Sequence, residues 1–290
     1  MASPPGTLAG NLPAMRIGYQ GEAHSYSYRA VGEVFPNDEP VGYPSFVASF
    51  DALDDGSVDR LVMPVENSTT GSVLPVLDRL AGAEGRPPVS IRREHLVEIR
   101  HALLGVPGAD LSAVRYVKSH PEALAQAEAT LNRLGIRPVP RHDTAGAARE
   151  VAADGDPEIA ALGPPESGPP HGLAVLREDT MDRDHNTTRF FVLAKGGTEV
   201  DHDDDKTTIM FVTAHRPGAL ALALTELGLR GANLTRIESR PSDEAWSYRF
   251  FVDLVHPPGA EGLQRVIEPQ PATLAHLLVL GSYRARRSDT

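Results

Sequence analysis

Three segments place hydroxyl and amide side chains where a strand is expected to pass into a helix. They are residues 21–27, 66–72 and 119–122. Backbone N–H groups at a helix N-terminus attract anions, and neighbouring Ser, Thr and Asn side chains add hydrogen-bonding groups. The same residue types are also ordinary helix caps. Each segment is therefore either an anion site or a structural cap.

A metal site is not expected from the acidic run near residue 200. Asp201, Asp203 and Asp205 match the first ligands of a calcium loop, but Lys206 replaces the turn glycine and Val212 the bidentate glutamate. A solvated linker explains this run better.

Other common chemical motifs are missing from the sequence. The 11 histidines form no HExxH pattern or other zinc spacing, and His95 and His101 are six positions apart. The sequence also contains no GxGxxG after a strand, no GxxxxGK[ST] and no GxSxG. We therefore expect no metal, nucleotide or other cofactor.

Composition narrows the class of protein. With 290 residues, 41% hydrophobic and 23% charged, the chain can bury a large core and is long enough for about two domains. The lack of cysteine excludes disulfides and thiolate chemistry and favours a reducing, cytoplasmic setting. The net charge of −11 disfavours nucleic acid. Apolar runs are far shorter than the ~20 residues of a membrane span, and we expect no signal peptide.

The pattern along the chain predicts a loose tail at residues 1–14, an α/β region at 15–195, a linker at 196–206 and a second module at 207–285. In the α/β region the expected strands are 16–19, 60–65, 114–117, 137–141, 159–162 and 187–194. Expected helices are 45–53, one from Ser72 onward, one capped by Ser119, and 145–153, capped by Asp143 or Thr144.

The second module has an unusually regular pattern. It predicts strands at 207–214, 233–240, 247–255 and 277–284, with helices at 218–229 and 261–268. This order is βαββαβ, a ferredoxin-like fold.

Several strings, taken together, resemble the prephenate dehydratase family. In the α/β region they are PVENSTTGSV (64–73), SHPEALAQ (119–126), DTA (143–145), HGL (171–173) and NTTRF (186–190). In the second module RPGAL (216–220), NLTRIESRP (233–241) and VLGSY (279–283) resemble the ACT regulatory domain of the same enzymes. The resemblance covers nearly everything from Met15 to Arg284.

The resemblance implies a catalytic region of two α/β lobes, like type II periplasmic binding proteins, with the site in the cleft between them. It also implies conversion of prephenate to phenylpyruvate, carbon dioxide and water. In the family the threonine of the Thr-Arg-Phe motif is assigned to the chemistry, which corresponds to Thr188. Asn67 and Gln126 correspond to further site residues.

These residue types suit the reaction. Loss of carbon dioxide and a hydroxyl creates an aromatic ring, so the protein need only position and polarise the substrate. A hydroxyl at Thr188 could assist the departing hydroxyl, while Asn67, Ser68 and Thr69 could hold a carboxylate without a cation that would oppose decarboxylation. Alternatively, Thr188 is simply a β-branched strand residue.

The predicted substrate-binding set also contains Ser119, Thr144, Gln126 and Arg189. Gln126 lies between apolar helix positions, so a structural hydrogen bond is nearly as good an interpretation. Arg189 points away from Thr188 if both lie in a strand, because neighbours alternate faces. It reaches a substrate carboxylate only if the strand begins later.

The second module is expected to bind phenylalanine as an effector. Gly218 permits a close backbone approach, and a helix N-terminus follows it. The family binds phenylalanine between two ACT modules, which implies a homodimer or homotetramer. The predicted effector-binding residues are Gly218, Ala219, Leu220, Asn233, Leu234, Thr235, Glu238 and Ser239.

Two loops differ from the family pattern. His24 replaces a glycine, and His171 replaces the tyrosine before Gly-Leu. Arogenate is therefore a second candidate substrate. Two further functions fit the same fold: a non-catalytic amino-acid sensor and a non-aromatising prephenate decarboxylase.

Overall fold

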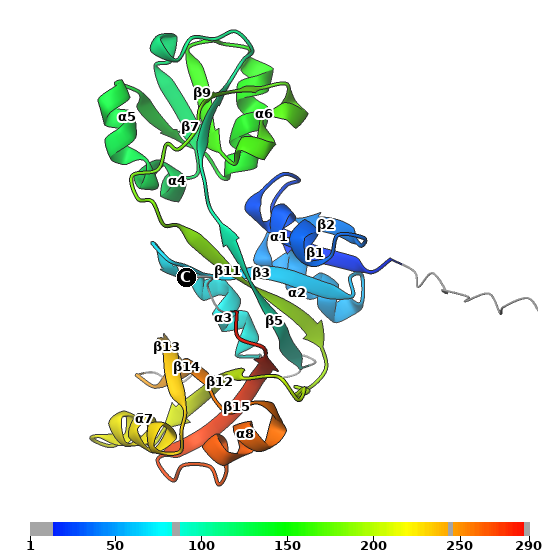
Figure 1. Ribbon diagram of the computed structural model, residues 1–290, viewed down its shortest axis with the longest axis vertical. Coiled ribbons are helices and arrows are strands. Elements are labelled where there is room, and N and C mark those ends of the chain that lie inside the picture. Colours follow the sequence, from blue (N-terminus) through cyan, green and yellow to red (C-terminus); the bar gives the residue numbers. More distant parts are fainter. Residues whose placement is uncertain (1–13, 83–87, 243–245, 287–290) are drawn as a thin grey trace, which may run out of the picture.

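The computed structural model describes residues 14–82, 88–242 and 246–286, which form three parts, each built on its own sheet (Figure 1). Two parts are α/β lobes and the third is the C-terminal module, so the expected fold class is confirmed. The tail expected at residues 1–14 lies, except for Ala14, outside the described residues. Among those residues, no helix combines the length and the apolar character needed to cross a membrane.

The first lobe carries a sheet of order β2-β1-β3-β11-β5, with β4 paired to β3. Ser45 caps α2 by accepting from the Ala48 N–H, as expected for a helix starting there. The strands β2 and β5 were not predicted, whereas α1 begins within the expected strand-to-helix segment at residues 21–27. The elements are β1 Arg16–Gln20, α1 Tyr26–Val34, β2 Glu39–Tyr43, α2 Phe46–Asp55, β3 Arg60–Asn67, β4 Gly71–Ser72, α3 Leu74–Leu80, β5 Val89–Glu98 and β11 Thr187–Lys195.

The second lobe has a sheet of order β10-β6-β9-β7-β8, which packs on three helices. Asp143 caps α6 by accepting from the Gly146 N–H over 2.6 Å. The elements are β6 Ala102–Gly105, β7 Tyr116–Ser119, α4 Pro121–Gln126, α5 Glu128–Leu134, β8 Arg137–Pro140, α6 Thr144–Asp154, β9 Ile159–Gly163 and β10 Ala174–Arg177, with single 3₁₀ turns at Leu111–Ala113, Pro165–Ser167 and Pro169–His171.

Two helix starts differ from the prediction. The helix α3 begins at Leu74, because Ser72 lies in the short strand β4 and its hydroxyl contacts the C-terminal module. The cap of α4 is His120, whose Nδ1 accepts from the Glu122 N–H at 3.3 Å. The expected single helix after Ser119 is broken at Ala127, which separates α4 from α5.

The chain passes between the lobes twice, at residues 99–101 and 178–186. The two passages are hydrogen-bonded to each other. The Ile99 N–H donates to the Asn186 carbonyl over 2.8 Å, and the Thr180 hydroxyl donates to the His101 carbonyl over 2.6 Å. The first residues of β11 are therefore fixed against the end of β5.

The C-terminal module has the predicted βαββαβ order, with an antiparallel sheet of order β13-β14-β12-β15. The edge strand β13 alternates between exposed and half-buried residues. The elements are β12 Lys206–Thr213, α7 Ala219–Leu229, β13 Asn233–Pro241, β14 Tyr248–Val255, α8 Gly259–Ile267 and β15 Leu274–Tyr283.

The first lobe and the C-terminal module share one hydrophobic core. Phe191 of β11 packs with Phe251 and Tyr283 of the module in a single buried cluster. Gly281 of β15 lies so close to β5 that a Cβ there would stand 2.2 Å from the Ile91 carbonyl oxygen. The C-terminal module is therefore docked on the first lobe, as Figure 1 shows.

The acidic run between them is less solvated than expected. Asp204 is buried, and its carboxylate accepts from the Asp201 N–H over 2.9 Å. Asp205 accepts from the Ala285 N–H over 2.7 Å. These two carboxylates organise the connection between β11 and β12.

Candidate functional site

The candidate site forms where the end of β3 meets the start of β11. The two strands are antiparallel, and Asn67 is directly opposite Thr188. A residue pair opposite one another in adjacent strands places its side chains on the same face of the sheet. The predicted catalytic threonine and the predicted asparagine are thus neighbours.

The side chain of Asn67 organises the loop that follows β3. Its Oδ1 accepts from the Thr69 N–H at 2.9 Å, from the Thr69 hydroxyl at 2.6 Å and from the Thr70 N–H at 3.1 Å. Its Nδ2 donates to Asn186 Oδ1 at 2.6 Å and to Thr188 Oγ1 at 3.0 Å. An amide group has only two N–H donors, so both are used by the protein itself.

A ring of hydrogen bonds joins the two lobes at this point. Gln126 Nε2, from α4 of the second lobe, donates to Thr69 Oγ1 over 3.0 Å. Gln126 Oε1 accepts from Asn186 Nδ2 over 2.9 Å, and Asn186 returns to Asn67. The predicted residues Asn67, Thr69 and Gln126 are therefore brought together with Thr188. Asn186 was missed as a site residue, although it begins the NTTRF string.

The direction of the hydrogen bond between Asn67 and Thr188 leaves the hydroxyl proton of Thr188 available. Its Oγ1 accepts from the Asn67 amide, and a hydroxyl has one O–H donor besides its acceptor lone pairs. The residue is half-buried at the start of β11. Its hydroxyl can therefore donate to a departing oxygen while its orientation is held by Asn67.

The remaining small residues of the predicted substrate-binding set have different surroundings. Ser68 is exposed, and its Oγ accepts from the Thr187 N–H over 3.0 Å. Ser119 is fully buried and donates to the Leu162 carbonyl over 2.5 Å, so its hydroxyl fastens β7 to β9. Thr144 is the half-buried first residue of α6. The geometry ties Ser68 to the site and gives Ser119 a structural role instead of the predicted substrate contact.

The structure contradicts the predicted substrate contact of Arg189. Thr187, Thr188 and Arg189 are all within β11, so Arg189 points to the opposite face from Thr188. Its guanidinium is buried against Glu94, Asp253 and two further polar groups between the first lobe and the C-terminal module. The strand begins too early for the alternative in which Arg189 reaches the substrate.

A buried ring side chain outside the predicted set, His101, supports Gln126. His101 is buried between the lobes, and its Nδ1 is 3.1 Å from the Tyr26 hydroxyl of α1. Burial lowers the pKa of His101 to about 4, and a hydrogen bond with Gln126 opposes this only in part. The imidazole is therefore neutral near pH 7. His101 was considered only for a zinc spacing, which could not reveal this contact.

The two loops that depart from the family pattern lie opposite each other across the lobes. The rings of His24 and His171 are 6.4 Å apart. Close to them, Glu22 of the first lobe forms an ion pair of 2.9 Å with Arg149 of the second. The two histidines thus occupy the same region between the lobes, and His24 has a positive φ of 66°.

The predicted effector residues occupy two different environments. Gly218, with φ of 79°, precedes α7 and lines a hollow together with Arg216 and Trp246. Glu238 faces the first lobe, where its carboxylate accepts from the Ser72 hydroxyl over 2.7 Å. Within β13 the predicted residues Asn233, Thr235 and Ser239 are exposed, whereas Leu234 packs on the module core. Ala219 is buried and Leu220 half-buried at the start of α7.

Across the described ranges, no cluster of three or more His, Asp or Glu side chains could hold a metal ion. The hydrogen-bonded ring at the site consists of uncharged amides and hydroxyls. Such a ring suits positioning and proton donation by neutral groups.

Comparison with known proteins identifies the family. The family model described as Prephenate dehydratase matches residues 17–198, and the model described as ACT domain matches residues 207–271. The chain belongs to the prephenate dehydratase family. Members are dehydratases, so the chain belongs to a family of lyases, with a C-terminal ACT domain.

Individual relatives agree with this assignment. The chain is 35% identical to an arogenate dehydratase/prephenate dehydratase from Arabidopsis thaliana, described as chloroplastic, covering 94% of this chain and 74% of that protein. It is 32% identical to a bifunctional N-acyl-homoserine lactone acylase/prephenate dehydratase from Komagataeibacter europaeus, covering 93% of this chain and 95% of that protein. A solved prephenate dehydratase from Arthrobacter aurescens in complex with L-Phe is similar to this structure with a TM-score of 0.79 and 28% identity. The match covers 93% of this chain and 90% of that one.

Proposed function

We propose that this member of the prephenate dehydratase family converts prephenate to phenylpyruvate, carbon dioxide and water. The observation that carries the proposal is the oriented hydroxyl of Thr188, which accepts from Asn67 and keeps its own proton free. In the reaction the bond between the ring and the carboxylate breaks, and its electron pair moves into the ring. The C–O bond of the ring hydroxyl then breaks while Thr188 donates a hydrogen bond to the departing oxygen, and the hydroxide takes up a proton from solvent and leaves as water.

The charge distribution at the site supports this chemistry. The ring residues beside Thr188 are uncharged, and the adjacent Arg189 lies on the other face of β11. A cation beside the departing carboxylate would stabilise the ground state more than the transition state. A neutral ring of amides instead positions the substrate without holding back carbon dioxide.

Arogenate is the second candidate substrate. Relatives of this chain include proteins described as arogenate dehydratases, among them one from Petunia hybrida at 34% identity. His24 and His171 face each other between the lobes, where they could contact the part of the substrate in which arogenate and prephenate differ. Arogenate would give phenylalanine directly.

The test is product identification with purified protein. The protein is incubated with prephenate and, separately, with arogenate, without added metal or cofactor, and the products are identified by chromatography and mass spectrometry. We expect phenylpyruvate from prephenate. Phenylalanine from arogenate alone would change the assigned substrate. Binding of either compound without product would support a sensor, and loss of carbon dioxide without loss of the hydroxyl would support a decarboxylase.

We further propose that phenylalanine regulates the enzyme through the ACT domain and that ACT domains pair between copies of the chain. The solved relative from Arthrobacter aurescens is described as a complex with L-Phe. In this chain Leu222 and Leu229 of α7 are exposed, and their spacing of seven residues places them on the same face of the helix. Ile237 of the edge strand β13 is also exposed. The two leucines lie on one face of α7 and offer an apolar surface that a second copy of the chain would cover. Light scattering of wild type and Leu229→Glu would test this pairing.

A further inference from the structure

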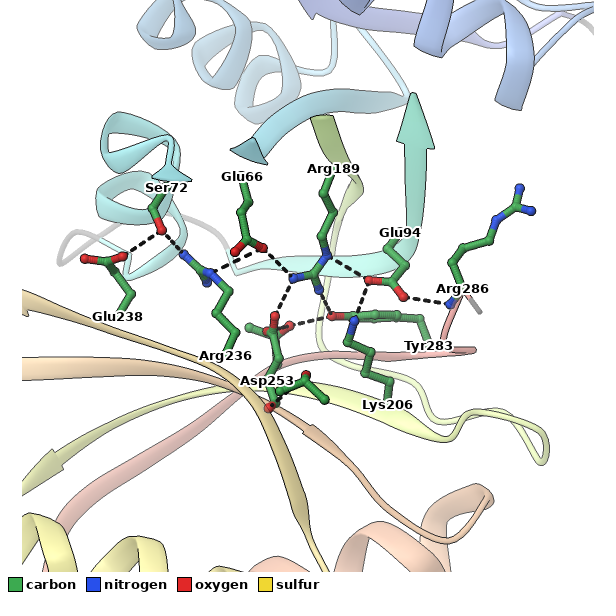
Figure 2. Close-up of polar contacts among 12 residues, drawn as sticks. Glu66, Ser72, Glu94, Arg189, Lys206, Arg236, Glu238, Asp253, Tyr283 and Arg286 are labelled. Atoms are coloured by element: carbon green, nitrogen blue, oxygen red, sulfur yellow. Dashed lines mark hydrogen bonds and ion pairs between the residues drawn. The ribbon is translucent and has the colours of Figure 1, made fainter. Parts of the chain in front are cut away.

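Arg189 lies in a cluster of charged and polar side chains between the catalytic region and the ACT domain (Figure 2). On the catalytic side its Nε is 2.8 Å from Glu94 Oε2, and its Nη1 is 3.3 Å from Glu66 Oε2. On the ACT side Nη1 donates to Asp253 and Nη2 donates to the Tyr283 hydroxyl over 2.9 Å. One guanidinium thus contacts both domains.

The charged residues of this cluster are buried, so their contacts with one another must be well placed. Asp253 is 0% exposed, Glu94 2% and Arg189 8%. Removing a charge from water is costly unless well-placed partners replace the lost hydration. Burial alone would raise the pKa of Asp253, but Arg189 and Arg236 hold that pKa below its usual value. The ion pair is therefore intact near neutral pH and fixes the position of Arg189.

The cluster lies directly behind the candidate site. In the pairing of β11 with β3, Thr188 is opposite Asn67 and Arg189 is opposite Glu66. Side chains alternate between the two faces of a strand, so each strand presents one residue to the site and the next to the ACT domain. A shift of Arg189 therefore moves the backbone that carries Thr188.

A second contact connects the ACT domain to the loop that carries Asn67 and Thr69. Ser72 ends this loop and pairs with Glu66. Its hydroxyl donates to Glu238 over 2.7 Å and accepts from Arg236 Nη2 over 2.6 Å. Both partners belong to β13, the strand in which effector residues are predicted. Figure 2 shows this contact beside the Arg189 cluster.

We propose that Arg189 is a positioning residue for Thr188 and that Asp253 of the ACT domain acts through it. This inference rests on the proposed dehydratase function. The ACT domain thereby completes the catalytic geometry, and an effector that displaces its sheet relative to β11 lowers turnover. A coupling of this kind is typically worth a several-fold to hundredfold change.

A purely structural ion pair makes a different prediction. Loss of a structural pair lowers stability without changing the rate per folded molecule. Loss of a positioning contact lowers kcat, since a displacement of about 1 Å in a catalytic group can cost on the order of 10²-fold. KM should change much less, because Thr188 acts on the departing hydroxyl and substrate binding involves other groups.

The test compares Asp253→Asn with Asp78→Asn in the full-length protein. Asp253→Asn keeps the shape of the side chain and removes its charge. Asp78→Asn is the matched control, because Asp78 also forms an interdomain ion pair, with Arg240 over 2.7 Å, but it lies on α3 rather than beside the site. We expect kcat to fall by on the order of 10-fold in Asp253→Asn with KM within about twofold. The control should keep both values.

Two further measurements keep the test decisive. If Asp253→Asn fails to fold, Tyr283→Phe replaces it, because this variant removes only the hydroxyl that accepts from Arg189. Hydrogen exchange of peptides covering residues 67–72 and 187–190 should become faster in Asp253→Asn and stay unchanged in Asp78→Asn.

The outcomes separate the two proposals. A folded Asp253→Asn protein, or the Tyr283→Phe protein in its place, with wild-type kcat and unchanged exchange overturns the positioning role. Equal losses of kcat in Asp78→Asn overturn it as well. Inactivity of the wild type with prephenate and with arogenate refutes the proposed function instead, and hydrogen exchange still decides whether Asp253 orders the site.

Discussion

The side-chain amide of Asn67 donates a hydrogen bond of 3.0 Å to the hydroxyl oxygen of Thr188. The same amide also donates to Asn186, so both of its N–H groups are occupied within the protein. Asn67 therefore sets the direction in which Thr188 can donate its proton. This gives Asn67 a role in orientation, where the sequence suggested direct binding of a substrate carboxylate.

Replacing Thr188 by alanine should abolish most turnover. The hydroxyl assists the leaving group chiefly in the transition state, so we expect kcat to fall by on the order of 10²-fold or more with a much smaller change in KM. Steady-state kinetics on a variant shown to be folded by circular dichroism measures this. Thr188→Ser is the control, because it keeps the hydroxyl opposite Asn67. Turnover near the wild-type level in Thr188→Ala would remove Thr188 from the mechanism.

Asn67→Asp tests hydrogen-bond direction with almost no change in shape. A carboxylate accepts and does not donate, so Thr188 would donate its proton to residue 67 instead of to the substrate. We expect a loss of kcat on the order of 10²-fold, similar to the removal of one preorganised donor in other enzymes. Thr70→Ala, in the same loop but exposed, should retain activity. A change confined to KM would instead restore the substrate-binding interpretation of Asn67.

The sequence predicted those parts of the fold that depend on local patterns. The ACT module was predicted nearly strand by strand, because its helices and strands have regular apolar periods and Gly218 marks a helix start. In contrast, β5 was missed. Its interior carries Glu94 and His95, and both are buried only through partners distant in sequence, such as Lys206 and Glu33. No local pattern indicates those partners.

The candidate site likewise combines features that local patterns predicted with features that they did not. Thr188, Asn67, Thr69 and Gln126 were selected from their motifs. The structure joins Asn67, Thr69 and Gln126 in one hydrogen-bonded ring, and Thr188 is bonded to it through Asn67. Arg189 was assigned to the substrate because the start of its strand was uncertain by one or two residues, and such a shift reverses the face to which a side chain points. The direction of each hydrogen bond, which changes the role of Asn67, is not contained in a motif.

Stability should depend on pH through His101. The pKa of its imidazole falls from 6.5 to about 4 on folding because the ring is buried. Between these values the unfolded chain binds a proton that the native protein does not, so the free energy of unfolding falls as the pH is lowered. One pKa unit corresponds to about 1.4 kcal/mol, which gives roughly 3 kcal/mol across this range.

Urea unfolding of wild type and His101→Gln at pH 7 and pH 4.5 measures this contribution. Glutamine does not titrate, so the variant should lose less stability than wild type over the same interval, by roughly 2–3 kcal/mol. The remaining titrating groups are common to both proteins and cancel in the comparison. Equal losses in the two proteins would show that His101 does not resist protonation in the native state.

Phenylalanine binding should depend on Gly218. This residue has φ of 79° before α7, and it lines a hollow with Arg216, Trp246 and Tyr248. A β-branched residue is strained at positive φ, so Gly218→Val should turn the N–H groups that begin α7 away from a carboxylate and weaken binding by about 10-fold or more.

Calorimetry with L-phenylalanine at millimolar concentration tests wild type, Gly218→Val and the control Gly228→Ala, whose added methyl group meets no atom within 4 Å. Wild type and control should bind equally, because Gly228 lies far along the helix from its N-terminus. Undiminished binding by Gly218→Val, or none by the wild type, would place the effector elsewhere or exclude it.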